Sequence, residues 1–131
     1  MTAVVPPPAV DLALALAQHA AYVEALRACG LDVIDLPPDE DHPDAVFVQD
    51  PVLIAGGVAI RLRSAAPSRQ GEADGLVEAL CPYLPVRNLA APATLDGGDV
   101  LVADDRLYVG LSSRSNRAGC VVARRRYRTH S

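Results

Sequence analysis

Two aspartates six residues apart are the first candidates for chemistry in this sequence. Asp44 and Asp50 flank the apolar run Val46-Phe47-Val48. If residues 45–49 form a strand, alternation places positions 44, 46, 48 and 50 on one face, with a carboxylate at each end. Buried carboxylates are costly unless they meet a cation or hydrogen-bond donors. The pair therefore predicts a receptor for a guanidinium or ammonium group, although two loop aspartates beside a core strand would give the same pattern.

Three downstream segments strengthen the first interpretation. They read APSRQGE at 66–72, ATLDGGDVL at 93–101 and VGLSSRSN at 109–116. Together with PDAVFVQDP at 43–51, their order and spacing resemble the dimethylarginine dimethylaminohydrolase family, whose members modify guanidino groups and have an α/β-propeller fold. The resemblance runs from about residue 11 to residue 119 and implies hydrolysis of arginine or methylated arginine to citrulline and an amine.

The resemblance implies binding roles for four charged residues. Asp44 matches the family aspartate near the substrate's α-amino group, and Asp50 matches the carboxylate that grips the guanidinium. Arg63 and Arg114 match the two arginines that take the α-carboxylate, for which a forked guanidinium is well suited. Without the resemblance, both arginines would be interpreted as surface or ion-pairing residues.

Two further matches bear on catalysis and on substrate choice. Asp96 matches the acidic partner that orients the catalytic histidine, and its simpler interpretation is a turn residue before Gly97-Gly98. Gln49 stands where the family usually has a glutamate that also contacts the guanidinium. Because an amide accepts a hydrogen bond without carrying charge, we expect a weaker attraction for a cation and leave the guanidino substrate open.

The family's catalytic histidine and cysteine belong to the second half of its members, which has no counterpart in this sequence. Cys120 and His130 are ten residues apart in a basic tail with nothing to orient them, so we expect neither to replace those groups. The sequence therefore predicts a truncated half. Its alternatives are a non-catalytic module that binds arginine-like amino acids, or an inactive remnant.

Residue patterns predict a mixed α/β fold. We expect a helix from Asp11 to a stop at Gly30, and a second helix over 70–80. The expected strands are 31–36, 45–49, 52–55, 58–62, 100–103 and 106–109, with 85–89 as strand or loop. Gly56-Gly57 is a hairpin signal between two of these strands, and Asp104-Asp105 is expected to form another turn. Asn116 is a candidate cap for a third helix, but no apolar stripe follows it.

The resemblance implies that these elements form a partial α/β-propeller of about two ββαβ-type units over residues 10–116. A proline-rich lead-in at 1–9 and an arginine-rich, divergent tail at 117–131 flank it. Such a half would expose strand edges, so we expect self-association or a complementing chain.

Composition narrows the remaining possibilities. The chain has 131 residues and a net charge of −4, with three scattered cysteines that fit no metal motif and no apolar run long enough for a membrane span. We expect a cytoplasmic protein without metal or cofactor. All five basic residues after position 116 are arginines, but an acidic domain with one basic run is a poor candidate for nucleic-acid binding.

Overall fold

The computed structural model describes residues 10–103 and 106–127, with side chains as far as residue 122. The proline-rich lead-in, the predicted Asp104-Asp105 turn and the last four residues of the tail lie outside the described part. The chain divides into two compact units, Met1–Asp35 and Leu36–Ser131.

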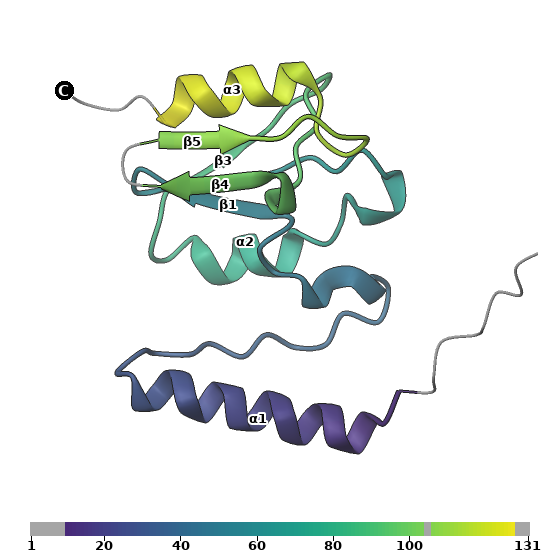
Figure 1. Cartoon of the computed structure of the whole chain (residues 1–131), viewed down its shortest axis with the longest axis vertical. Helices are drawn as coiled ribbons and strands as arrows, with labels where there is room; N and C mark the ends of the chain where they lie inside the picture. The colour runs from purple at the N-terminus through teal and green to yellow at the C-terminus, as the bar shows by residue number, and fades with distance from the viewer. Residues whose placement is uncertain (1–9, 104–105, 128–131) are drawn as a thin grey trace, which may run out of the picture. The chain divides into compact units, whose positions relative to one another are not determined.

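The first unit contains one long helix, α1 (Leu12–Ala28), shown in purple and blue in Figure 1. Asp11 caps it by accepting a hydrogen bond from the Leu14 backbone N–H at 3.0 Å. The helix ends where Gly30 takes a positive φ of 82°. Both predicted ends are confirmed. Within the described residues, no helix is long and apolar enough to cross a bilayer.

The second unit contains a three-stranded sheet in the order β1-β2-β3. The antiparallel pair β1 (Val52–Ala55) and β2 (Val58–Arg61) turns at Gly56-Gly57, whose positive φ values of 58° and 71° suit a tight hairpin. Helix α2 (Asp74–Leu80) then leads to β3 (Val86–Asn88), which runs parallel to β2. The hairpin is confirmed, and α2 begins four residues later than predicted.

A second hairpin and a third helix complete this unit. Strands β4 (Val100–Ala103) and β5 (Arg106–Val109) pair antiparallel with the predicted bounds. Helix α3 (Arg117–Tyr127) follows although its sequence lacks an obvious apolar stripe. The Asn116 side chain accepts from the Gly119 backbone N–H at 2.9 Å, which is the geometry of the predicted cap.

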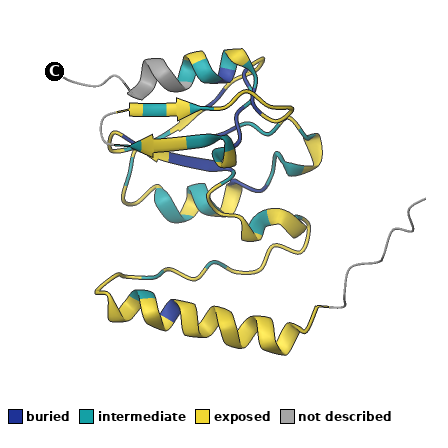
Figure 2. Ribbon diagram, in the orientation of Figure 1, coloured by how far each residue is buried: buried dark blue, intermediate teal, exposed yellow. Residues whose placement is uncertain are grey.

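The core lies on both faces of the first sheet. On one face, Val52 and Ala59 pack beneath apolar residues of α2. On the other, the buried cluster around Leu53, Ile60 and Leu95 is covered by residues of β4, β5 and α3. In this unit α2 and α3 accordingly lie on opposite sides of the strands (Figure 1), and buried residues concentrate on β1 (Figure 2).

Two predicted strands are wrong. Residues 31–36 have no strand partner, and in place of a strand at 45–49 the chain forms a short 3-10 helix, η1 (Pro43–Val46), followed by a turn. Val46, Phe47 and Val48 are exposed rather than part of a buried strand face. Asp44 and Asp50 therefore do not lie at the two ends of one strand.

Candidate functional site

The candidate site lies at the open end of the β1–β2 hairpin. Asp50 comes just before β1 and Arg63 just after β2, so antiparallel pairing brings them to the same end. The segment 95–97 runs beside both of them. Leu95 donates its backbone N–H to the Arg63 carbonyl at 3.1 Å, and Gly97 donates to the Asp50 carbonyl at 2.9 Å. These bonds carry the downstream Asp96 to the end of the first hairpin.

A cavity opens at this junction. Its apolar lining consists of Pro51, Leu62, Ala73 and Leu95. Its polar lining consists of Asp50, Ser64, Arg69, Gln70, Glu72 and Asp96. Among the described residues, no group of histidine, cysteine and acidic side chains is arranged to hold a metal ion.

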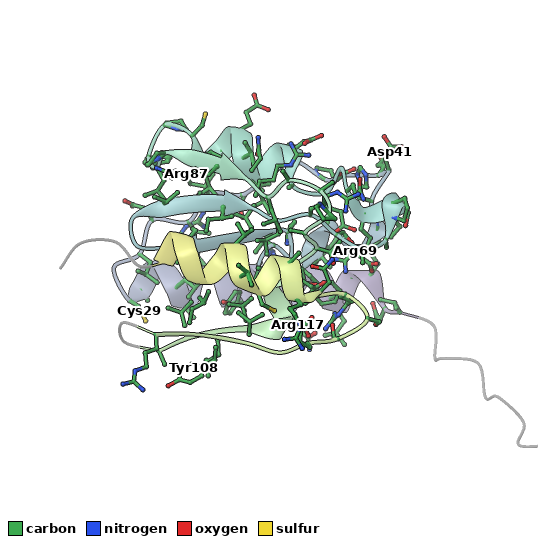
Figure 3. All side chains as sticks on the ribbon, turned by 90° about the horizontal axis from the view of Figure 1, so that it is seen from above. Cys29, Asp41, Arg69, Arg87, Tyr108 and Arg117 are labelled. Atoms are coloured by element: carbon green, nitrogen blue, oxygen red, sulfur yellow. The ribbon has the colours of Figure 1, made fainter. Side chains whose placement is uncertain are left out.

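The Arg69 guanidinium occupies the centre of an acidic cluster (Figure 3). Its Nε and Nη2 donate to the two oxygens of buried Glu72 at 2.7 and 2.8 Å. Its nitrogens also lie 3.4 Å from an Asp50 oxygen, 3.7 Å from Asp44 and 3.8 Å from Asp96. Hydrogen bonding of the guanidinium to Glu72 is the main reason that the pKa of Arg69 lies above its ordinary value. This pair keeps one positive charge fixed among the carboxylates.

Asp96 is the most deeply buried aspartate of the cluster, at 5% exposure. Burial raises its pKa above the ordinary value, and the neighbouring charges of Asp50 and Asp99 add to that effect. A hydrogen bond from the Gly98 backbone N–H and the positive charge of Arg114 act in the opposite direction. The carboxyl group consequently holds its proton more tightly in the folded chain than in the unfolded one.

This raised pKa predicts a pH-dependent effect of Asp96→Asn. A folded-state pKa above the unfolded value favours the fold below the unfolded pKa, and this contribution is lost as pH rises through the folded value. The asparagine variant stays neutral, so its unfolding free energy should improve relative to the wild type as the pH rises above about 4, the ordinary pKa of an aspartate. Urea denaturation at several pH values measures this difference. A difference that is constant or shrinks with rising pH would contradict the assignment.

The structure brings together four of the six predicted site residues. Asp44, Asp50 and Asp96 surround Arg69, and Arg114 Nη1 lies 3.5 Å from Asp96 Oδ1. Asp44 and Asp50 thus meet the Arg69 guanidinium because the chain bends at η1, and not because they share a strand face.

Gln49 and Arg63, like Asp44 and Arg114, are not among the residues that line the cavity. Gln49 is exposed and contributes its backbone to the turn before β1. Arg63 contributes its carbonyl to the Leu95 hydrogen bond, and nearby Arg61 pairs with Asp74 of α2. Their predicted binding roles remain predictions.

Arg69 is the residue that sequence reasoning missed. It lies in η2 (Pro67–Arg69), in a segment recognised by the resemblance but given no role. The spacing of Arg69 and Glu72 was a usable indication, because residues three apart on a helical turn can form an ion pair. Nothing local indicated that Asp50 and Asp96 would meet the same guanidinium.

The cysteines and histidines do not gather at the site. Cys29 and Cys81 are exposed, and Cys120 is half-buried in α3. The ring of His42 makes a 2.8 Å contact from Nδ1 to an Asp39 oxygen. His130 lies outside the described residues, so the idea of a Cys120–His130 pair stays untested.

Comparison with known proteins identifies relatives along most of the chain. The model of the family "N,N dimethylarginine dimethylhydrolase, eukaryotic" matches residues 9–127. An N(G),N(G)-dimethylarginine dimethylaminohydrolase of Pseudomonas aeruginosa is 44% identical over 111 residues, which are 83% of this chain and 44% of that protein. The Streptomyces coelicolor enzyme of the same name is 46% identical over 111 residues, covering 84% and 43%. The chain thus spans less than half the length of these relatives.

Solved structures agree with the sequence comparisons. A Pseudomonas aeruginosa dimethylarginine dimethylaminohydrolase variant in complex with citrulline aligns with a TM-score of 0.80 at 43% identity, over 86% of this chain and 45% of that one. An amidinotransferase from Microseira wollei aligns with a TM-score of 0.77 at 17% identity over 94% and 48%, a likeness of fold alone. The extent of the family match, supported by these identities, means that this chain belongs to the dimethylarginine dimethylaminohydrolase family.

Proposed function

We propose that this chain supplies the substrate-binding half of a dimethylargininase-like hydrolase site, in a partial α/β-propeller of which β1–β2–α2–β3 is one unit. By itself it binds an arginine-like amino acid without converting it to citrulline. The described residues that line the cavity include neither a cysteine nor a histidine, so in this proposal a complementing partner supplies the nucleophile and the proton-transfer group for hydrolysis. Exposed Leu101 and Tyr108 on the second hairpin offer apolar surface for such a partner or for a second copy.

This proposal rests on the unequal contacts that Arg69 makes with its neighbouring carboxylates. Its bidentate bonds to Glu72 have the 2.7–2.8 Å length typical of charge-assisted hydrogen bonds. The distances to Asp50 and Asp96, 3.4 and 3.8 Å, are longer. Arg69 is therefore neutralised mainly by Glu72, and the other two carboxylates keep acceptor capacity for a ligand guanidinium. A planar guanidinium satisfies two carboxylates through paired N–H donors better than an ammonium does.

The two arginines of the site complement the other end of such a ligand. Arg69 and Arg114 both approach Asp96, from distances of 3.8 and 3.5 Å. An α-carboxylate between the two guanidinium groups would accept hydrogen bonds from both. Asp96 would then no longer be the one carboxylate that both arginines share. This proposal gives Arg69 the role that the sequence had suggested for Arg63.

Calorimetric titration with arginine, dimethylarginine and citrulline, beside an assay for citrulline release, tests the function. The wild-type chain should bind arginine and release no citrulline. Asp50→Asn should weaken arginine binding by about tenfold or more, because a charge-assisted hydrogen bond contributes about 1.5–3 kcal/mol.

Asp74→Asn is the matched control, since it makes the same chemical change at an exposed position in α2. It should leave binding unchanged. A folded wild-type chain that binds none of the three ligands would refute the binding half of the proposal, and citrulline release by the chain alone would refute its catalytic half.

A further inference from the structure

The loop that carries Arg114 depends on one residue outside the cavity, Asp99. This loop, residues 110–116, joins β5 to α3 without regular secondary structure. The Arg114 side chain is 50% exposed, so packing alone does not fix it. Its described side-chain partners are Asp96, which belongs to the cavity, and Asp99, whose Oδ1 lies 3.5 Å from Arg114 Nη2.

The other oxygen of Asp99 fixes the loop itself. Asp99 Oδ2 accepts hydrogen bonds from the hydroxyls of Ser112 and Ser115, both at 2.6 Å. The Ser112 hydroxyl oxygen in turn accepts from the backbone N–H groups of Arg114 at 2.9 Å and Ser115 at 3.2 Å. The two serine bonds are the main reason that the pKa of Asp99 lies below its ordinary value. The loop therefore folds around a carboxylate that stays ionised.

Ser115 links this arrangement to the cavity. Its side chain is 1% exposed, and its hydroxyl oxygen accepts the Asp96 backbone N–H at 3.0 Å while the hydroxyl donates to Asp99. One buried hydroxyl thus ties the backbone of Asp96 to Asp99, and Asp99 also contacts the Arg114 side chain. The relative positions of buried Asp96 and exposed Arg114 therefore depend on the Ser115 hydroxyl.

An amide cannot replace the Asp99 carboxylate. If the asparagine oxygen takes the Oδ2 position, its NH₂ group faces the Arg114 guanidinium, donor against donor. If it takes the Oδ1 position, the two serine hydroxyls lose their shared acceptor. Either orientation loosens the hold on Arg114, while no residue that lines the cavity is itself replaced.

We propose that Asp99 is the positioning residue that holds Arg114 ready for the α-carboxylate of the bound amino acid. This inference rests on the proposed function and deepens it, because it assigns selection for a carboxylate-bearing ligand to a residue beyond contact with that ligand. A guanidino compound without a carboxylate should not sense the loss of Asp99.

Titration of wild type, Asp99→Asn and Arg114→Met with arginine and with agmatine, its decarboxylated analogue, tests the inference. Wild type should prefer arginine. Asp99→Asn should weaken arginine binding about tenfold, the scale of one charge-assisted contact, and agmatine binding less than twofold. Arg114→Met should give the same pattern, and the double variant should be no worse than Arg114→Met alone.

The outcomes separate the inference from the function on which it rests. If Asp99→Asn weakens both ligands equally, or neither, the inference is wrong while the guanidino site stands. If a folded wild-type chain binds neither ligand, the proposed function fails and the inference fails with it. Circular dichroism and thermal melting of each variant show whether it is folded.

Discussion

Replacing Arg69 by methionine is expected to lower the free energy of unfolding by about 3–5 kcal/mol, the usual cost of removing one partner from a buried ion pair. Glu72 and Asp96 are 6% and 5% exposed, so the loss of Arg69 would leave two carboxyl groups without their shared cation and with little access to water. Glu72 would also lose two short hydrogen bonds. Chemical denaturation at neutral pH measures the loss, which is large beside the 5–15 kcal/mol typical of a domain.

Two further variants separate burial of charge from the change of side chain. Arg27→Met makes the same substitution at an exposed pair with Glu24, and it should cost less than about 1 kcal/mol. Adding Glu72→Leu to Arg69→Met should recover part of the loss, because the double variant no longer buries the unpaired Glu72 carboxylate. Equal small losses at positions 69 and 27 would mean that the acidic cluster does not depend on Arg69.

Local sequence patterns predicted the hairpins and the cap of α1, but they did not predict the acidic cluster around Arg69. Both hairpins followed from short apolar runs around turn residues, and the bounds 52–55, 100–103 and 106–109 are confirmed. A hairpin is specified by neighbouring residues, so its pattern is complete within about ten positions. The cap of α1 at Asp11 is local in the same sense.

The failed strand at 45–49 has a physical reason. Pro43 suits the first turn of a helix, and the apolar residues that follow do not enter a core. A strand needs a partner, and no partner for this segment was visible in the sequence. The alternation of side chains along residues 44–50 predicted a strand, but the chain forms a 3-10 helix and a turn there.

The family motifs supplied long-range information that local patterns lack, and three of the residues they indicated lie together in the structure. Asp44, Asp50 and Asp96 are separated by up to 52 positions and meet at Arg69 because residues 95–97 pair with the ends of the first hairpin. Arg69 was missed because its role depends on these distant aspartates. The sequence near Arg69 shows only its pairing with Glu72.

Gly97→Ala tests that junction directly and is expected to lower the unfolding free energy by about 3 kcal/mol or more, at or beyond the upper end of ordinary overpacking. A Cβ at Gly97 would lie 1.8 Å from the Gln49 carbonyl oxygen and 3.1 Å from the Asp50 Cα. Both are backbone atoms, so no side-chain rotation relieves the clash. The Gly97 N–H bond to the Asp50 carbonyl would have to lengthen or break, which separates Asp50 from Asp96. Denaturation measures the stability, and arginine titration the site.

Gly75→Ala is the matched control for this prediction. A Cβ at Gly75 would meet nothing within 4 Å, and the residue lies in α2. Because alanine loses less conformational freedom than glycine in a helix, this variant should gain up to about 1 kcal/mol. Opposite signs for the same glycine-to-alanine change would show that close backbone contact at Gly97 builds the site. If Gly97→Ala were as stable as Gly75→Ala and bound arginine as the wild type does, the two segments would not be joined in this way, and the meeting of Asp50 with Asp96 would need another cause.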